Sequence, residues 1–207
     1  MLCNAQDTLR YPINAMKGIR IGFDASKLLF PLIYNGERKG FEVTVDKFIK
    51  GDVFATLEAG WLKVNLDRQP DYIYTGNGLY GKLGVDLNLL KSRVPDSNDI
   101  IYGGVRYAYS KFSHQADNIK VPGHFWPDAT DMFIPKKNMT AHWLEILFGV
   151  KAEVIDNLYI NLTFRFKFLI VPPKDNLSTP YLIPGYGKGN SEFELGINYY
   201  VSYNIRF

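Results

Sequence analysis

The last stretch of the chain, residues 191–207, alternates between apolar and polar side chains along its whole length. Its apolar members are Phe193, Leu195, Ile197, Tyr199, Val201, Tyr203, Ile205 and Phe207. The residues between them are Glu192, Glu194, Gly196, Asn198, Tyr200, Ser202, Asn204 and Arg206. Because a β-strand points successive side chains to opposite faces, this stretch predicts one long strand with an apolar face and a polar face.

Seven earlier stretches alternate in the same way. They predict strands over residues 18–28, 40–48, 53–63, 77–88, 100–110, 141–151 and 158–168. Their connections are short near 49–52, 89–99 and 153–157, and long over 30–39, 65–76, 111–140 and 169–190. Short turns on one rim and long loops on the other are typical of a barrel that crosses a membrane. The sequence therefore predicts an all-β fold, an eight-stranded antiparallel up-and-down transmembrane β-barrel with long extracellular loops and short periplasmic turns.

The alternation by itself does not say which face lies inside. In a soluble lipocalin-like carrier, the apolar face would line a ligand cavity. Residues 158–168 carry six large apolar side chains, which would overfill a narrow lumen. Glycines recur on the polar face, as a crowded eight-stranded interior requires: Gly22, Gly60, Gly84, Gly104, Gly149 and Gly196. Both features favour an apolar face that contacts lipid.

Composition agrees with this orientation. No run of about 18 apolar residues is present, so no transmembrane helix is expected, whereas a barrel strand needs only about 9–11 residues. A mean hydropathy of −0.14 fits strands that are half polar. The net charge of +3 comes from scattered basic residues, which argues against a nucleic-acid partner.

The polar face carries seven basic and eight acidic side chains. They are Arg20, Asp24, Glu42, Asp46, Glu58, Lys82, Asp86, Arg106, Glu145, Lys151, Arg165, Lys167, Glu192, Glu194 and Arg206. An unpaired charge away from water costs several kcal/mol, so we expect these groups to pair and fill the lumen as a structural network. A selective pore would instead show rings of like charge.

The first residues are expected to precede the barrel. Cys3 and Ala5 followed by Gln6 are typical of the end of a signal peptide, with a lipoprotein cysteine as the alternative. We therefore assign 1–16 to a signal-peptide remnant and periplasmic lead, and 17–207 to the barrel.

Several motifs that resemble functional sites are better explained as ordinary loop and strand residues. No catalytic, cofactor or metal site is predicted. The run 76–81 matches a dinucleotide fingerprint but lacks the strand before it and the helix after it. His142 and Glu145 are three apart on a strand and face opposite sides. His114, His124 and the nearby Asp117, Asp128 and Asp131 read as solvated loop residues. Ser113 with His114 is the nearest candidate for a rim-sited lipid-modifying enzyme.

The long segment 111–140 contains a candidate interaction loop. Its large apolar residues are Phe125, Trp126, Phe133 and Ile134. Exposed apolar side chains of this kind mark binding surfaces. The alternative is that the loop folds over the barrel mouth and buries them itself.

Five segments carry a resemblance to a known family. They are Gly18–Lys27, Ala141–Glu145, Gly149–Glu153 with Asn157–Tyr159, and Tyr181–Tyr186. Over roughly 17–205 the chain resembles an uncharacterised family of small Bacteroidota outer-membrane β-barrels, and the closing aromatic Phe207 is similar to the end of such barrels. The resemblance implies an outer-membrane location and a signal peptide, and it carries no functional residues.

These observations predict a non-enzymatic protein of the bacterial outer membrane. We expect it to contact membrane lipid and to act as a structural or accessory protein beside other outer-membrane proteins. The alternatives are the rim-sited lipid-modifying enzyme and the soluble carrier.

Overall fold

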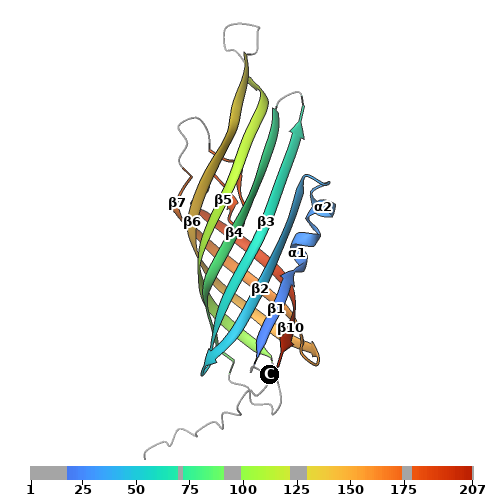
Figure 1. The fold of residues 1–207 in the computed structure, drawn as a ribbon, viewed down its shortest axis with the longest axis vertical. Helices are drawn as coiled ribbons and strands as arrows, with labels where there is room; N and C mark the ends of the chain where they lie inside the picture. Colours follow the sequence, from blue (N-terminus) through green and yellow to red (C-terminus); the bar gives the residue numbers. More distant parts are fainter. Residues whose placement is uncertain (1–17, 70–71, 91–98, 122–129, 174–178, 207) are drawn as a thin grey trace, which may run out of the picture.

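A computed structural model describes residues 18–69, 72–90, 99–121, 130–173 and 179–206, and shows a closed antiparallel barrel (Figure 1). The barrel strands are β1 (Ile19–Asp24), β2 (Arg38–Lys50), β3 (Val53–Arg68), β4 (Tyr72–Asn88), β5 (Ile100–Val121), β6 (Thr130–Ile155), β7 (Leu158–Val171) and β10 (Phe193–Ile205). Each strand pairs with its neighbours in the chain, and β10 closes the ring on β1. The predicted eight-stranded up-and-down barrel is confirmed.

Two of the three predicted short turns are confirmed at one end of the barrel. β2 passes to β3 through Gly51 at φ +65°, and β6 passes to β7 through Asn157 at φ +68°. Glycine and asparagine are the residues that enter this left-handed region at least cost. The third predicted turn, 89–99, lies largely outside the described residues.

Four strands are much longer than predicted. Residues 65–76 and 111–140 were expected to be irregular, but β3, β4, β5 and β6 run through most of both segments. In Figure 1 these strands rise above the rest of the barrel as one tall sheet. We call the part of β3–β6 above the ends of the other strands the raised sheet.

The reason for the difference is that the apolar residues change faces along these strands. They point outward in the lower part and inward in the upper part, which we call the change of phase. On β3, Leu57 is exposed and Glu58 buried, whereas a few residues later Leu62 is buried and Lys63 exposed. Outward Leu79, Tyr109 and Leu144 on the next three strands likewise give way to outward Asn77, Lys111 and Thr140. We call the zone of outward apolar side chains, which ends at Trp61, Leu79, Tyr109 and Leu144, the apolar belt. A search for one apolar face per strand does not recognise the inverted part.

The first strand is shorter than the predicted 18–28. β1 ends at Asp24, and α1 (Ala25–Leu28) and α2 (Phe30–Ile33) follow. The Asp24 carboxylate accepts a hydrogen bond from the Ser26 backbone at 3.0 Å, and Pro31 occupies the first turn of α2, two common helix-start features. α1 contacts both β2 and β10, so it occupies the gap that the short β1 leaves between them. Among the described residues, no helix is long and apolar enough to cross a membrane.

The described part of the last connection folds into the barrel. Its short hairpin of β8 (Leu182–Ile183) and β9 (Gly187–Lys188) places Ile183 and Tyr186 in a buried cluster with Tyr80 and Trp143. The Trp143 and Tyr186 rings meet edge to face at 5.6 Å. Lys167 donates to the carbonyl oxygens of Gly185 and Tyr186 at 2.9 and 2.8 Å. An apolar layer therefore covers the polar lumen from above.

Candidate functional site

Twelve of the fifteen charged residues predicted for the lumen are buried inside the barrel. They are Arg20, Asp24, Glu42, Asp46, Glu58, Lys82, Asp86, Arg106, Glu145, Lys151, Arg165 and Lys167, each no more than 9% exposed. They come from seven of the eight barrel strands. On each of these strands every second side chain points into the lumen, and the charged residues occupy these inward positions. We call this group, with the residue Lys27 described below, the lumen network.

The other three predicted members lie elsewhere. Glu192 and Arg206 are exposed, and Glu194 is half-buried near the rim. Arg206 pairs with Glu153 at 3.4 Å, and that pair is outside the lumen. Glu192 and Glu194 lie at the beginning of β10, and Arg206 directly follows its last residue.

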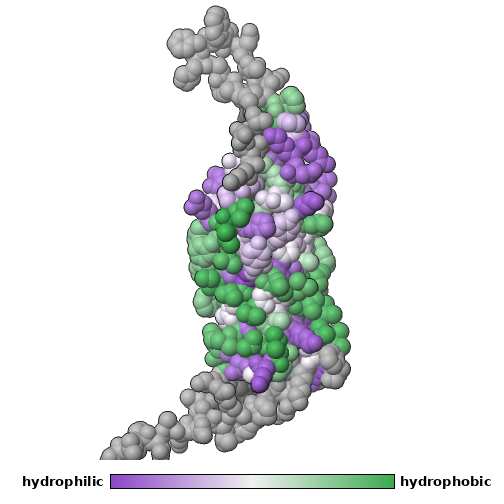
Figure 2. All heavy atoms as spheres, turned by 60° about the vertical axis from the view of Figure 1, so that its left-hand side comes forward, coloured by the Kyte–Doolittle hydropathy of each residue, from purple (hydrophilic) through white to green (hydrophobic). Residues whose placement is uncertain are grey.

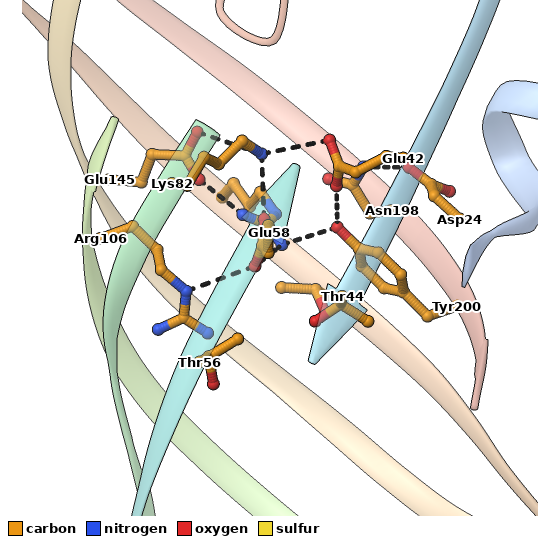
Figure 3. A network of polar contacts seen from close by, with 12 residues as sticks. Asp24, Glu42, Thr44, Thr56, Glu58, Lys82, Arg106, Glu145, Asn198 and Tyr200 are labelled. Carbon is orange, nitrogen blue, oxygen red and sulfur yellow. Dashed lines mark hydrogen bonds and ion pairs between the residues drawn. The ribbon is translucent and has the colours of Figure 1, made fainter. Parts of the chain in front are cut away.

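Glu58 lies at the centre of the lumen network (Figure 3). Its carboxylate is 2.9 Å from Arg165, 3.1 Å from Lys82 and 3.3 Å from Arg106. Arg165 reaches Glu145 with its other terminal nitrogen at 2.6 Å. One buried carboxylate thus ties together three cations from three strands.

Lys82 links this centre to a second carboxylate. Its ammonium is 3.5 Å from both Glu42 and Glu145, in addition to Glu58. Glu42 also accepts hydrogen bonds from Tyr80, at 2.5 Å, and from Tyr200. Charges and phenol groups therefore share their hydrogen bonds across the whole width of the lumen.

A third part of the network lies toward the short-turn end. Lys151 is 2.5 Å from Asp46 and 3.4 Å from Asp86. Asp86 pairs with Arg106 at 2.8 Å, and Asp46 lies 3.7 Å from Arg20. Arg106 thereby connects this part to Glu58.

Sequence reasoning missed Lys27, which α1 supplies to the lumen. Its ammonium contacts Glu42, Tyr80 at 2.6 Å and Asp24 at 3.4 Å. In the predicted strand 18–28, Lys27 would share the outward face of Ile19 and Ile21. The signal that could have found it is the helix start at Asp24 and Ser26, which turns the following side chains away from the strand alternation.

A small cavity lies among the members of the network. A cavity of about 10 Å³ is lined by residues that include Asp46, Asp86, Lys151 and Tyr102, and this is room for about one water molecule. Each of the six buried carboxylates has a basic or hydrogen-bonding partner. The arrangement is suited to holding the strands together. The part of the chain that the structure describes contains no cluster of His, Cys, Asp and Glu able to hold a metal ion.

Among the described residues, the paired candidates Ser113 with His114 and His142 with Glu145 do not share a face of the barrel. Ser113 and His114 point to opposite faces of β5: His114 is buried, and Ser113 donates to the backbone oxygen of Asn77 at 3.5 Å. His142 lies on the outer face, 2.5 Å from the Tyr107 hydroxyl, and Glu145 lies in the lumen. His124 and Asp128 are outside the described residues.

The candidate interaction loop divides into two described and two undescribed residues. Phe133 is 70% exposed at the upper end of β6. Ile134 packs against a buried cluster that includes Leu66 and Ala116. Phe125 and Trp126 lie outside the described residues, as does the predicted lead 1–16.

Solved structures with a similar chain path include two bacterial proteins. One is the attachment invasion locus protein Ail of Yersinia pestis, at 9% identity and a TM-score of 0.44, covering 91% of this chain and 99% of that one. Another is neisserial surface protein A, at 14% identity and a TM-score of 0.36, covering 91% of this chain and 94% of that one.

A search of curated proteins finds no match to this sequence. One family model matches residues 3–207, almost the whole chain. The protein therefore belongs to the family described as Domain of unknown function (DUF6048).

Proposed function

We propose that this protein is a non-enzymatic β-barrel of the bacterial outer membrane, with a structural or accessory role in the cell envelope. The observation that carries the proposal is the change of phase on β3–β6. Below it, Leu57 and Leu83 face outward while Glu58 and Lys82 face inward. Above it, the outer face is mostly polar and the inner face is mostly apolar.

Each arrangement suits a different solvent. A strand in lipid exposes apolar side chains and places polar ones in the lumen. A sheet in water does the reverse and buries its apolar face. Figure 2 shows hydrophobic side chains gathered over the lower part of the visible face, with hydrophilic ones more frequent above. The transition supports a membrane boundary near Trp61, Leu79 and Tyr109.

The filled lumen supports a structural role over transport. Buried ion pairs cross the lumen at Glu58, and the hairpin with Ile183 and Tyr186 covers it. A solute would have to break these pairs to pass. The opposite orientation of Ser113 and His114 supports the absence of a lipid-modifying activity. The Bacteroidota origin and the signal peptide that the resemblance implies stay predictions.

Fractionation and conductance measurements test this proposal. We expect the protein to pellet with the outer membrane and to migrate faster on gels unboiled than boiled. In planar bilayers the folded protein should give no stable conductance steps. Recovery in the soluble fraction would favour the lipocalin-like carrier, and stable ion-selective steps would contradict the structural role of the lumen.

An accessory role would use the raised sheet. Phe133 stands on it with 70% of its surface exposed, so its ring is available for contact with a partner. We expect a tagged protein, extracted in mild detergent, to retain an outer-membrane partner at stoichiometric amounts. Phe133→Ser should lose that partner and Lys136→Ser, three residues along β6, should keep it. Recovery of the barrel alone would leave a free-standing structural role.

A further inference from the structure

Three lysines form a basic patch on the outer face, at the upper edge of the apolar belt. Lys39 of β2 and Lys63 of β3 are direct cross-strand partners. Lys111 lies on β5, opposite Leu79 of β4. All three lysine side chains are exposed. We call Lys39, Lys63 and Lys111 the lysine patch.

The lysine patch lacks an acidic counterpart. None of the three lysines forms an ion pair with a carboxylate of the described residues. Asp67, the next outward acid on β3, is four residues beyond Lys63, or about 13 Å along a strand. Like charges directly opposite each other destabilise a sheet, so an anion between them would be stabilising.

Asn77 adds a neutral hydrogen-bond donor to the patch. It pairs with Lys63 on one side and with Ser113 on the other. Its side-chain oxygen accepts the indole N–H of Trp61 at 2.6 Å, which leaves the amide NH₂ group to donate to a ligand. The patch therefore combines three ammonium groups and an amide within four neighbouring strands.

An apolar wall lies directly below these groups. Phe41 lies two residues below Lys39 on β2 and is 44% exposed. Leu79 lies two residues from Asn77 on β4 and is 64% exposed. Trp61 lies between them at the level where aromatic residues mark a membrane interface. A ligand that fits both surfaces has an anionic head and apolar chains.

We propose that the lysine patch binds the phosphate-bearing head group of a lipid in the outer leaflet. This inference rests on the proposed outer-membrane location. The phosphate accepts hydrogen bonds from the lysines and Asn77, and the acyl chains lie against Phe41 and Leu79. Long lysine stems reach up from the edge of the belt and keep their ammonium groups at the head-group level.

Native mass spectrometry of the folded protein in a neutral detergent tests the proposal, with dioleoyl phosphatidic acid and phosphatidylcholine as probes. The patch variant replaces Lys39, Lys63 and Lys111 with Gln. The matched control replaces the exposed Lys47, Lys50 and Lys136 with Gln, so both variants lose three positive charges. Faster migration before boiling verifies that each protein is folded.

We expect phosphatidic acid to bind the wild type and the control equally well. Its affinity for the patch variant should be lower by a factor of about ten or more. Phosphatidylcholine binding should be the same in all three. Equal phosphatidic acid binding by the two variants would overturn the proposal. Displacement by an equal concentration of inorganic phosphate would identify a free-phosphate site and overturn the lipid assignment. A wild type found in the soluble fraction, without heat-dependent migration, would overturn the outer-membrane location as well.

Discussion

The lower barrel and the raised sheet are built by the same strands in opposite ways. In the lower barrel, outward Leu83 is 63% exposed and inward Lys82 is 2% exposed. In the raised sheet, inward Leu66 is 3% exposed and its neighbour Asp67 faces outward. The comparison shows that one β-strand can serve two solvents if its alternation changes phase where the solvent changes.

The two regions also differ in what fills their interiors. The lumen network holds the lower barrel with ion pairs, which are costly to break from one side because the remaining charge stays buried. In the raised sheet and just below it, β3 buries Leu62, Val64 and Leu66 against Leu182 of the inserted hairpin. There, stability comes from apolar area removed from water. Substitutions should therefore have different consequences in the two regions.

The largest effect is expected at the centre of the lumen network. Glu58→Ala leaves Arg165, Lys82 and Arg106 with fewer negative partners in a buried site. We expect it to lower the free energy of unfolding by about 3–5 kcal/mol. Urea unfolding in lipid vesicles, followed by tryptophan fluorescence, measures this change. Glu37→Ala, at a half-buried side chain outside the lumen, is the control, and an equal loss in both variants would contradict a structural role for the network.

A charge on the outer face separates the two regions most directly. Leu83→Arg places a charge in the middle of the apolar belt and should cost about 2–4 kcal/mol in a bilayer. Asn65→Arg places the same charge on the outer face of the raised sheet, which is already polar, and should cost nearly nothing. The same unfolding experiment compares them. Similar costs at both positions would show that the phase change is not a membrane boundary.

Lys27 links the helices to the lumen, so its removal should act locally. Lys27→Met keeps the length of the side chain but removes the contacts to Glu42, Asp24 and Tyr80. We expect a loss of about 2 kcal/mol, because Lys82 still pairs with Glu42. Limited proteolysis should then cut within residues 25–37 more rapidly. Cleavage as slow as in a Lys39→Met control would count against an anchoring role for Lys27.

The smallest effect is expected for the ion pair of Arg68 with the half-buried Glu37 at the rim. A hydrogen bond from Arg68, together with its charge, lowers the pKa of Glu37 below its usual value. A carboxyl group with a lowered pKa stabilises the fold above its unfolded pKa, near 4.3, and loses this contribution as the pH falls through its folded pKa. Arg68→Ala should therefore shift the unfolding midpoint slightly at pH 7 and less at pH 3. A larger shift at pH 3 would contradict this assignment.

The sequence by itself determined the strand count, the closed barrel and most of the lumen network. Alternation has a period of two, so an inward Glu58 implies that Thr56 and Gly60 also face inward, without knowledge of any neighbour. Of the fifteen charged residues that this alternation placed inside, twelve are buried in the lumen. The other three lie near the ends of the last predicted strand. The sequence still alternates there, but the barrel no longer fully encloses these side chains.

Tertiary structure alone decided where the strands end, what caps the lumen and which face is apolar above the belt. Residues 111–121 look irregular if the apolar face is expected outside, because Phe112 and Ala116 point inward to a cluster that distant segments complete. Lys27 enters the lumen only because β1 stops and α1 turns toward Glu42. In each case the deciding partner lies far away in the chain. Local periodicity records how side chains alternate, whereas the solvent or the residue that each face meets is a property of the assembled barrel.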